Sequence, residues 1–227
     1  SVASRFSDSQ VTAIDLSHSS LSYAKRRTNE LGITNINYIQ GDILDLIRLK
    51  SDFDIIECVG VIHHMEDPIA GWSALIDRLK PGGLMKIGLY SEIARKNIVR
   101  AKLSINTDIT SLDMKDIRRI RSQLIAEKNP FLCELALSND FYSSSSLRDL
   151  LLHSQEHHFT LPKIDMLIKK LGLIFIGFEF PDSRFLDKFA SHFPQRGAIY
   201  DLTKWHRFER LNSNFFSGMY QFWAQKI

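Results

Sequence analysis

The chain has 227 residues, of which 44% are hydrophobic and 24% charged, so it can form one sizeable core and does not have the composition of a disordered protein. Its formal charge of +3 is too small for a dedicated nucleic-acid surface. The chain has two cysteines, Cys58 and Cys133, which predict a cytoplasmic protein without a disulfide framework or a zinc motif. Its apolar runs are far shorter than the ~20 residues that span a bilayer, so we expect no membrane span.

The first clear element is a strand that ends in an acid. VTAID at residues 11 to 15 has the pattern of a buried strand, with Asp15 at its tip. A carboxylate at the tip of the second strand of a βαβ unit can accept hydrogen bonds from the two hydroxyls of a ribose. Asp15 is also compatible with a purely structural role near the N-terminus of the next helix. The glycine-rich loop that should precede such a strand is absent and the first residue is Ser, so we expect a fragment of a longer protein.

Helix and strand signals alternate up to residue 90. Ser17 is an expected helix N-cap and Gly32 the expected terminator of that helix. A second helix should start at Asp67 and Pro68 and stop at the PGG of residues 81 to 83. Strands are expected over residues 36 to 43, 53 to 62 and 84 to 90. This order predicts a doubly wound α/β sheet.

The pattern changes after residue 91. From 92 to 158 apolar residues recur at helical spacing, which predicts a helical insertion or lid between two core segments, 1–91 and 159–227, of a single domain. Thr160 should cap a further helix. Strands over 173–180 and 216–226, with a long loop from Pro181 to Phe215 between them, would then pair antiparallel at the sheet edge.

Three strand ends carry candidate binding residues. In a parallel sheet the ends at Asp15, Asp42 and Gly60 are all carboxyl ends, where ligands bind. Asp15 would take ribose hydroxyls and Asp42 would approach an adenine amino group, with Ile43 lining the ring. Asp42 after Gly41 is also compatible with an ordinary turn, and His63 and His64 with a polar start to a loop.

The blocks VTAIDLS, GDIL, FDIIECVGVIHHMEDP and LKPGGLMKIGLYS resemble, in sequence and order, those of the class I S-adenosylmethionine-dependent methyltransferases. The resemblance covers about residues 1 to 90 closely and the closing strands by topology. It implies S-adenosylmethionine as the cofactor and a Rossmann-like sheet, mostly parallel with an antiparallel C-terminal strand. The expected cofactor contacts are Asp15, Leu16, Asp42, Ile43, Cys58, Val59, Gly60 and His63, with the run from Cys58 to Val61 beneath the methionyl part.

The family's first strand and glycine-rich loop, which lie at the centre of its sheet, are not in this chain. We therefore expect a gap between the strand that ends at Asp15 and the strand at 53–62, and poor cofactor binding by the chain alone. Two later segments, FYSSSSLRDLLLHSQEHHFTLP and WHRFERLNSNFFSGMYQFW, resemble a bacterial subgroup that is often attached to tetratricopeptide repeats, which would lie upstream. That resemblance names no methyl acceptor, so the expected partner is an unidentified small molecule or protein.

Methyl transfer from this cofactor needs a base only if the acceptor arrives protonated, and His64, His153 and His157 are the candidates. Tyr90, at a strand end, is a candidate pocket residue. If helix continues to His158, then Asp149, His153, Glu156 and His157 share one polar face. That face is compatible with a solvated surface, a lid over the substrate or a metal site, but HSQEHH is not the HExxH arrangement and we predict no metal.

Two other functions stay open. A nicotinamide-dependent oxidoreductase also uses an acid-tipped second strand, but it would usually need a YxxxK pair, which we do not expect here. A methyltransferase-like scaffold that has lost its cofactor and binds partners is the non-enzymatic alternative. A GxGxG-like loop about twenty residues before Asp15 would favour an enzyme, and bulky residues there would favour the scaffold.

Overall fold

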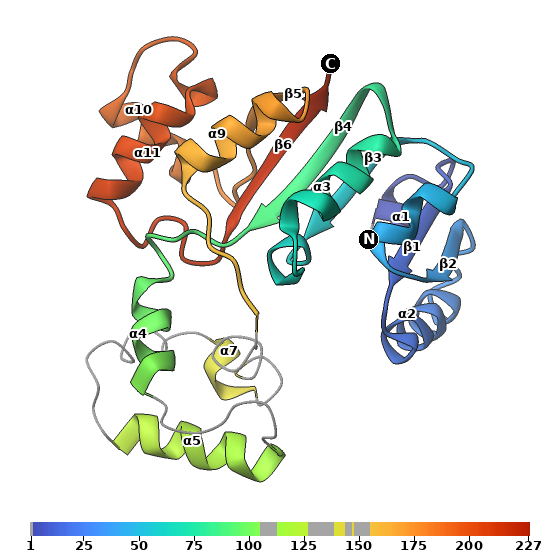
Figure 1. The fold of residues 1–227 in the computed structure, drawn as a ribbon, viewed down its shortest axis with the longest axis horizontal. Coiled ribbons are helices and arrows are strands. Elements are labelled where there is room, and N and C mark those ends of the chain that lie inside the picture. The colour runs from blue at the N-terminus through green and yellow to red at the C-terminus, as the bar shows by residue number, and fades with distance from the viewer. Residues whose placement is uncertain (1, 105–112, 127–138, 144–146, 148–154) are drawn as a thin grey trace.

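The structure is a computed structural model that describes residues 2–104, 113–126, 139–143, 147 and 155–227. Its strands are β1 (Val11–Asp15), β2 (Ile36–Gln40), β3 (Phe53–Val59), β4 (Leu79–Leu89), β5 (Leu173–Phe178) and β6 (Tyr220–Lys226). The described residues form two sheets, a parallel β1–β2 pair and a four-stranded sheet in the order β3-β4-β6-β5 (Figure 1). Strand β6 is antiparallel to both of its neighbours, and β3 and β4 are parallel. The predicted α/β class with an antiparallel C-terminal strand is confirmed.

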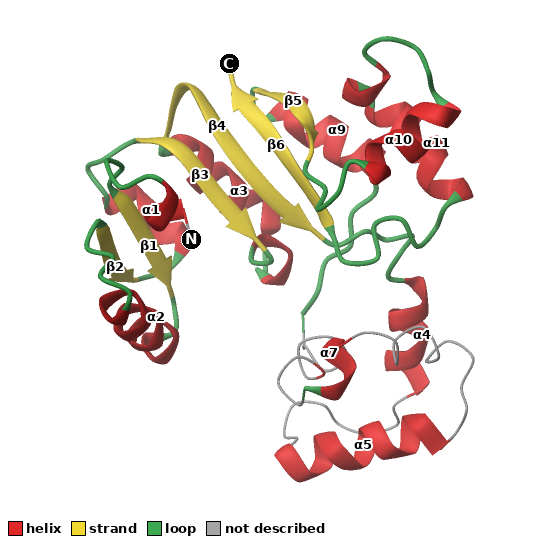
Figure 2. Cartoon of the chain, turned by 180° about the vertical axis from the view of Figure 1, so that it is seen from behind, coloured by secondary structure: helices red, strands yellow, loops and turns green. Residues whose placement is uncertain are grey.

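Helices before the insertion are α1 (Val2–Arg5), α2 (His18–Glu30) and α3 (Pro68–Asp77), with 3₁₀ segments η1 (Ile43–Arg48) and η2 (Ile62–His64). Helix α9 (Leu161–Lys170) follows the insertion. Helices α3 and α9 lie side by side on one face of the four-stranded sheet, in front of it in Figure 1 and behind it in Figure 2. Trp72 of α3 and Ile164 of α9 are fully buried there with Met85, Ile87 and Phe222 from the strands. This layer is the core that holds the ends of β3 and β4 in place.

The expected helix boundaries are confirmed at their caps. The side chain of Ser17 accepts from the Ser20 amide, and that of Asp67 accepts from the first turn of α3, with Pro68 at its start. Gly32 has φ +67°, the left-handed conformation that ends a helix at little cost only for glycine. Thr160 caps α9 by accepting from the Lys163 amide.

The expected gap in the sheet is present. Strand β1 pairs with β2 and β3 pairs with β4, and no pairing joins β1 to β3 in the part of the chain that the structure describes. Figures 1 and 2 both show the β1–β2 pair with α1 and α2 as a separate unit beside the free edge of β3. Ile14 and Ile43 of this unit still pack against the main hydrophobic core.

Strand β4 begins earlier than expected, which corrects the role given to the PGG turn. Phe53 of β3 pairs with Leu79, but Ile55 pairs with Leu84, so residues 80–83 form a bulge inside β4. Gly82 has φ +74°, and a Cβ on Gly83 would lie 2.8 Å from the Lys80 carbonyl oxygen. The glycines therefore permit a bulge within the strand instead of separating it from α3.

The prediction of a long loop from 181 to 215 is wrong, because this segment is largely helical. It forms α10 (Arg184–His192), η4 (Ala198–Tyr200) and α11 (Leu202–Leu211), the last capped by Asp201. The Phe189 ring stacks on the Trp205 ring at 3.6 Å between centroids, and both are fully buried. Trp205 is thus core and not a pocket edge. Burial of aromatic rings outweighs the turn-like signals of the prolines and glycines here.

The insertion forms α4 (Lys96–Ser104), α5 (Met114–Ala126) and α7 (Asn139–Tyr142), which lie apart from the sheet at the bottom of Figure 1. Ile117, Ile120 and Leu124 form the buried face of α5, as predicted. Residues 148–154, including Arg148, Asp149 and His153, lie outside the described part. None of the helices in the described ranges has the length and hydropathy that crossing a membrane requires.

Candidate active site

The carboxyl ends of β1 and β2 place two acids at one edge. Asp15 is the register partner of Gln40, and its carbonyl oxygen accepts from the Gly41 amide at 3.2 Å, so Asp42 follows on the neighbouring strand. The Asp15 carboxylate is exposed and accepts from the Ser17 amide at 2.7 Å. Asp42 accepts from the Leu44 amide at 2.9 Å and caps η1. Both acids therefore have the local turn roles that the sequence left open.

These turn bonds use Oδ1 of each acid. The predicted neighbours differ in exposure: Leu16 is 68% exposed, and Ile43 is half-buried against the core. The edge offers two carboxylates and an apolar side chain on adjacent strands, the arrangement that a nucleoside's hydroxyls, amino group and ring would require. The contacts of these residues with a cofactor stay predictions.

The end of β3 presents mainly its main chain. Gly60 has φ +79°, and its amide donates to the Gly88 carbonyl oxygen of β4 at 3.4 Å. The Cys58 side chain lies in the core, and burial raises the pKa of its thiol to about 11. Cys58 can therefore reach a ligand only through its backbone, whereas Val59 is partly exposed. The predicted run beneath a methionyl group would be a main-chain surface.

His63 is the most unusual group of the site. Its side chain is fully buried, with its ring centroid 4.0 Å from that of Tyr90 and 4.3 Å from that of His64. Burial, and then the neighbouring His64, lower the pKa of His63 to about 4, although Glu156 and the Gly88 carbonyl act in the opposite direction. Neither ring nitrogen has a hydrogen-bond partner among the described residues. A neutral, fully buried imidazole is therefore left at this site.

Arg95 also lies against the Tyr90 ring. Its guanidinium carbon lies 3.5 Å from the Tyr90 ring centroid, and its Nε and Nη2 donate to the two Glu156 carboxylate oxygens at 2.9 and 3.0 Å. His158 Nε2 lies 2.6 Å from Glu156 Oε1. Burial raises the pKa of Glu156, but the bonds and charges of His158 and Arg95 outweigh it and lower that pKa to about 2. Glu156 is therefore a carboxylate anchor shared by two basic side chains.

Residues 155–159, here called the strap, cover these rings. The His157 amide donates to the His63 carbonyl oxygen at 2.8 Å, and the Phe159 amide donates to that of Tyr90 at 2.9 Å. The Glu92 amide donates back to the Phe159 carbonyl oxygen at 2.9 Å, which forms an isolated parallel bridge between Ser91 and Phe159. The strap closes over the ends of β3 and β4 by main-chain bonds.

The condition for a shared polar face, a helix that continues to His158, is not met. Residues 155–158 are not helical, so Glu156 and His157 do not share a helical face. The main-chain partners offered by His63 and Tyr90 outweigh the local helical pattern. His153, the third candidate base, lies outside the described residues.

The structure brings two of the predicted bases to the site. His64 Nδ1 lies 3.0 Å from the Gln155 carbonyl oxygen, which can only accept, so Nδ1 carries the proton and Nε2 is the basic nitrogen. His157 Nε2 is buried without a hydrogen-bond partner in the described part of the chain. Sequence reasoning missed Arg95 and its pairing with Glu156. No spacing signals a contact between residues on either side of an insertion.

Two other expectations can be checked at this point. No group of three or more His, Cys, Asp or Glu side chains with metal-site geometry occurs in the described ranges. The expectation that no YxxxK pair exists is wrong, because Tyr200 and Lys204 have this spacing. However, Tyr200 is 58% exposed in η4, and Lys204 Nζ lies 3.5 Å from Asp201, remote in sequence from the strand ends described above.

Residues 1–83 match the family model described as a methyltransferase domain. The chain is 33% identical over 210 residues to an uncharacterized protein of Synechococcus sp., covering 88% of this chain and 50% of that protein. It is 40% identical over 76 residues to a ubiquinone biosynthesis O-methyltransferase of Coxiella burnetii, covering 32% of this chain and 31% of the enzyme. The chain thus spans half or less of these relatives.

Two solved structures share the fold. PKMT2 from Rickettsia typhi in complex with AdoHcy matches with a TM-score of 0.71 at 15% identity, over 98% of this chain and 45% of that one. The plantazolicin methyltransferase BamL matches with a TM-score of 0.51 at 18% identity, over 99% of this chain and 71% of that one. At these identities the similarity concerns the fold.

Proposed function

We propose that the chain is a class I S-adenosylmethionine-dependent methyltransferase domain that takes part in methyl transfer to an acceptor held beside His63 and His64. The match of residues 1–83 to the methyltransferase family model and the shared fold support this proposal. The observation that carries this proposal is the order of three strand ends, at Asp15, Asp42 and Gly60, leading to the neutral, buried imidazole of His63.

The residues at the strand ends fit the cofactor of this family. The exposed Asp15 carboxylate can accept from ribose hydroxyls while Oδ1 keeps its bond to the Ser17 amide, because each carboxylate oxygen has two lone pairs. Asp42 and Ile43 would meet the adenine, and the positive φ of Gly60 lets the main chain pass close to the methionyl part. When bound, S-adenosylmethionine supplies an activated methyl group on a sulfonium centre.

The histidines would act on the acceptor. Neutral His63 offers one donor and one acceptor to an acceptor's polar group, and His64 is oriented with Nε2 as its proton-accepting atom. We assign His64 the role of general base for an acceptor that arrives as a hydroxyl or a protonated amine. The strap would exclude water from His63 and Tyr90 through its main-chain bonds to them.

The unpaired edges of β1 and β3 favour a second candidate, a scaffold that binds partners without cofactor. Asp15 and Asp42 lie at the end of one sheet and Gly60 and His63 at the end of another. Within the described residues no main-chain ladder joins these two halves of the proposed site. The comparisons favour the methyltransferase over the nicotinamide-dependent oxidoreductase, because the matched family model is a methyltransferase domain and BamL is a methyltransferase.

Calorimetry on the full-length protein tests the proposal. S-adenosylmethionine and S-adenosylhomocysteine should both bind, and Asp15→Ala should weaken both by about tenfold to a hundredfold, as expected for a lost charge-assisted hydrogen bond. The matched control is Asp45→Ala, which removes an exposed acid of η1 and should leave affinity unchanged. Absence of binding by the full-length protein would support the scaffold instead.

A further inference from the structure

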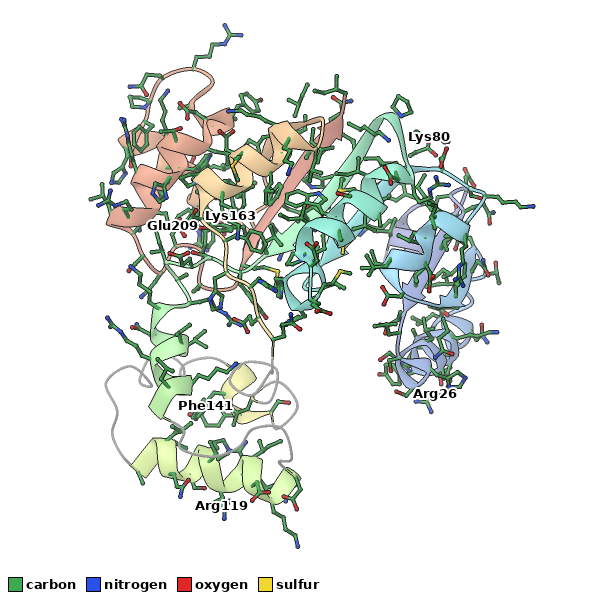
Figure 3. All side chains as sticks on the ribbon, in the orientation of Figure 1. Arg26, Lys80, Arg119, Phe141, Lys163 and Glu209 are labelled. Carbon is green, nitrogen blue, oxygen red and sulfur yellow. The ribbon has the colours of Figure 1, made fainter. Side chains whose placement is uncertain are left out.

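A buried polar triad lies beside the site and has no part in the proposed chemistry. Glu209 of α11 accepts from the Ser91 hydroxyl at 2.5 Å and from the Tyr220 hydroxyl at 2.7 Å. The three residues are at most 1% exposed. Figure 3 shows Glu209 beside the point where the chain leaves β4 toward α4, at the opposite end of the sheet from Lys80.

Burial of the Glu209 carboxyl group at this position is energetically unfavourable. Burial raises the pKa of its carboxyl, and the charge of Glu92 acts in the same direction, although the bonds from Ser91 and Tyr220 oppose them. No Lys or Arg forms an ion pair with Glu209 in the described residues. Well-packed apolar residues often stabilise a core at least as well as buried charged groups do. A carboxyl group here therefore suggests a role in fixing one particular geometry.

Ser91 connects this carboxyl to the turn of residues 91–95, which leads into the insertion. The Ser91 hydroxyl oxygen, while donating to Glu209, accepts from the Ala94 amide at 3.1 Å. The Ser91 carbonyl oxygen accepts from the Arg95 amide at 3.0 Å. The turn from Ser91 to Arg95 is thus held at both its side chain and its main chain. This turn directs Arg95 onto Tyr90 and into the carboxylate of Glu156.

We propose that Glu209 is a positioning residue that acts through Ser91: it fixes the turn that carries Arg95, and so keeps the strap closed over His63. The importance of the closed strap for methyl transfer rests on the proposed function. The coupling from Glu209 to the strap does not, because it depends only on the contacts of these residues.

Hydrogen exchange measured by NMR on the full-length protein tests this coupling without an acceptor. In Glu209→Gln the amides of Glu92, His157 and Phe159, which tie the strap to the site, should exchange about tenfold faster, as expected for loss of a hydrogen bond of about 1.4 kcal/mol. Amides of the β3–β4 ladder should keep their rates, because neither strand contains Ser91, Glu209 or Tyr220. A purely structural role would instead accelerate exchange throughout the sheet.

Two further variants locate the path and provide the control. Ser91→Ala removes only a hydroxyl and should accelerate the same strap amides, and the double variant should add little, since both residues act in one chain of contacts. Glu179→Gln is the matched control: Glu179 also accepts from two side chains, Lys86 and Trp223, but lies beyond β5, and the strap should not respond.

An NMR titration of His63 provides an independent readout. Opening of the strap in Glu209→Gln or Ser91→Ala should admit water and move the His63 titration upward, toward that of an ordinary histidine. Unchanged strap exchange and unchanged His63 titration in Ser91→Ala would overturn the proposal, even if Glu209→Gln fails to fold. Faster exchange in Glu209→Gln spread evenly over both sheets would also overturn it.

Discussion

Arg95 and Glu156 form a bidentate ion pair whose side chains are 3% and 9% exposed. One residue lies just after β4 and the other just before α9, so the pair closes the neck through which the chain enters and leaves the insertion. The same guanidinium lies on the Tyr90 ring, whose centroid is 4.0 Å from that of His63. The geometry of the site and the attachment of the insertion are therefore set by the same contacts.

Removal of Glu156 should destabilise the fold strongly. Glu156→Ala leaves the Arg95 charge buried without a partner, a change that costs about 3 to 5 kcal/mol. Urea unfolding measures this loss. Asp165→Ala, which removes an exposed partner of Lys169, is the control and should cost about 0.5 kcal/mol or less. Equal losses in the two variants would show that the buried pair is no stronger than a surface one.

The lowered pKa of Glu156 predicts an acid limit to stability. Its pKa is about 2 in the folded chain and 4.5 in the absence of the fold. The ion pair therefore contributes fully above pH 4.5, and its contribution is lost as the pH falls toward 2. The urea concentration at the unfolding midpoint should decrease as the pH falls through this window. In Glu156→Gln this decrease should be smaller. An unchanged decrease in this variant would assign the acid sensitivity to other groups.

His63 predicts a second, separate window. Its pKa is lowered from 6.5 to about 4, so the unfolded chain binds the proton more readily than the folded chain between these values. Stability should be complete above pH 6.5 and fall as the pH drops from 6.5 toward 4. An NMR titration of the imidazole carbon resonances checks the value directly, with His63→Asn identifying the signal. A His63 that titrates near 6.5 would mean that the strap does not bury it in solution.

The separation of β1 from β3 predicts weak cofactor binding by these 227 residues on their own. The acids at Asp15 and Asp42 would have to be ordered against the end of β3 during binding, and that ordering costs affinity. Calorimetry with S-adenosylhomocysteine should give a Kd weaker than about 1 mM, which corresponds to about 4 kcal/mol. Micromolar binding by this chain would show that the two sheets already form one site.

Local signals predicted the parts of the fold that local chemistry determines. The caps at Ser17, Asp67 and Thr160 are confirmed because each depends on a side chain and amides within three residues of it. The gap beside β3 is confirmed because the order of the motifs defines which strands are neighbours.

The features that sequence reasoning missed depend on contacts between distant residues. Helices α10 and α11 form because Phe189 and Trp205 stack in a common core, which no short window reveals. The strap is extended because His63 and Tyr90 offer main-chain partners to residues that are helical by pattern. Arg95 and Glu156 form an ion pair although they are 61 residues apart, on either side of the insertion.

Transfer of a labelled methyl group tests the central claim most directly. Full-length protein would be incubated with S-adenosylmethionine labelled in its methyl group and with an extract of cell metabolites and proteins. We predict that an acceptor becomes labelled, that Asp15→Ala reduces labelling through weaker cofactor binding, and that His64→Ala reduces it by about a hundredfold or more at saturating cofactor. A full-length protein that binds the cofactor and labels no acceptor at any pH would contradict the proposed methyl transfer.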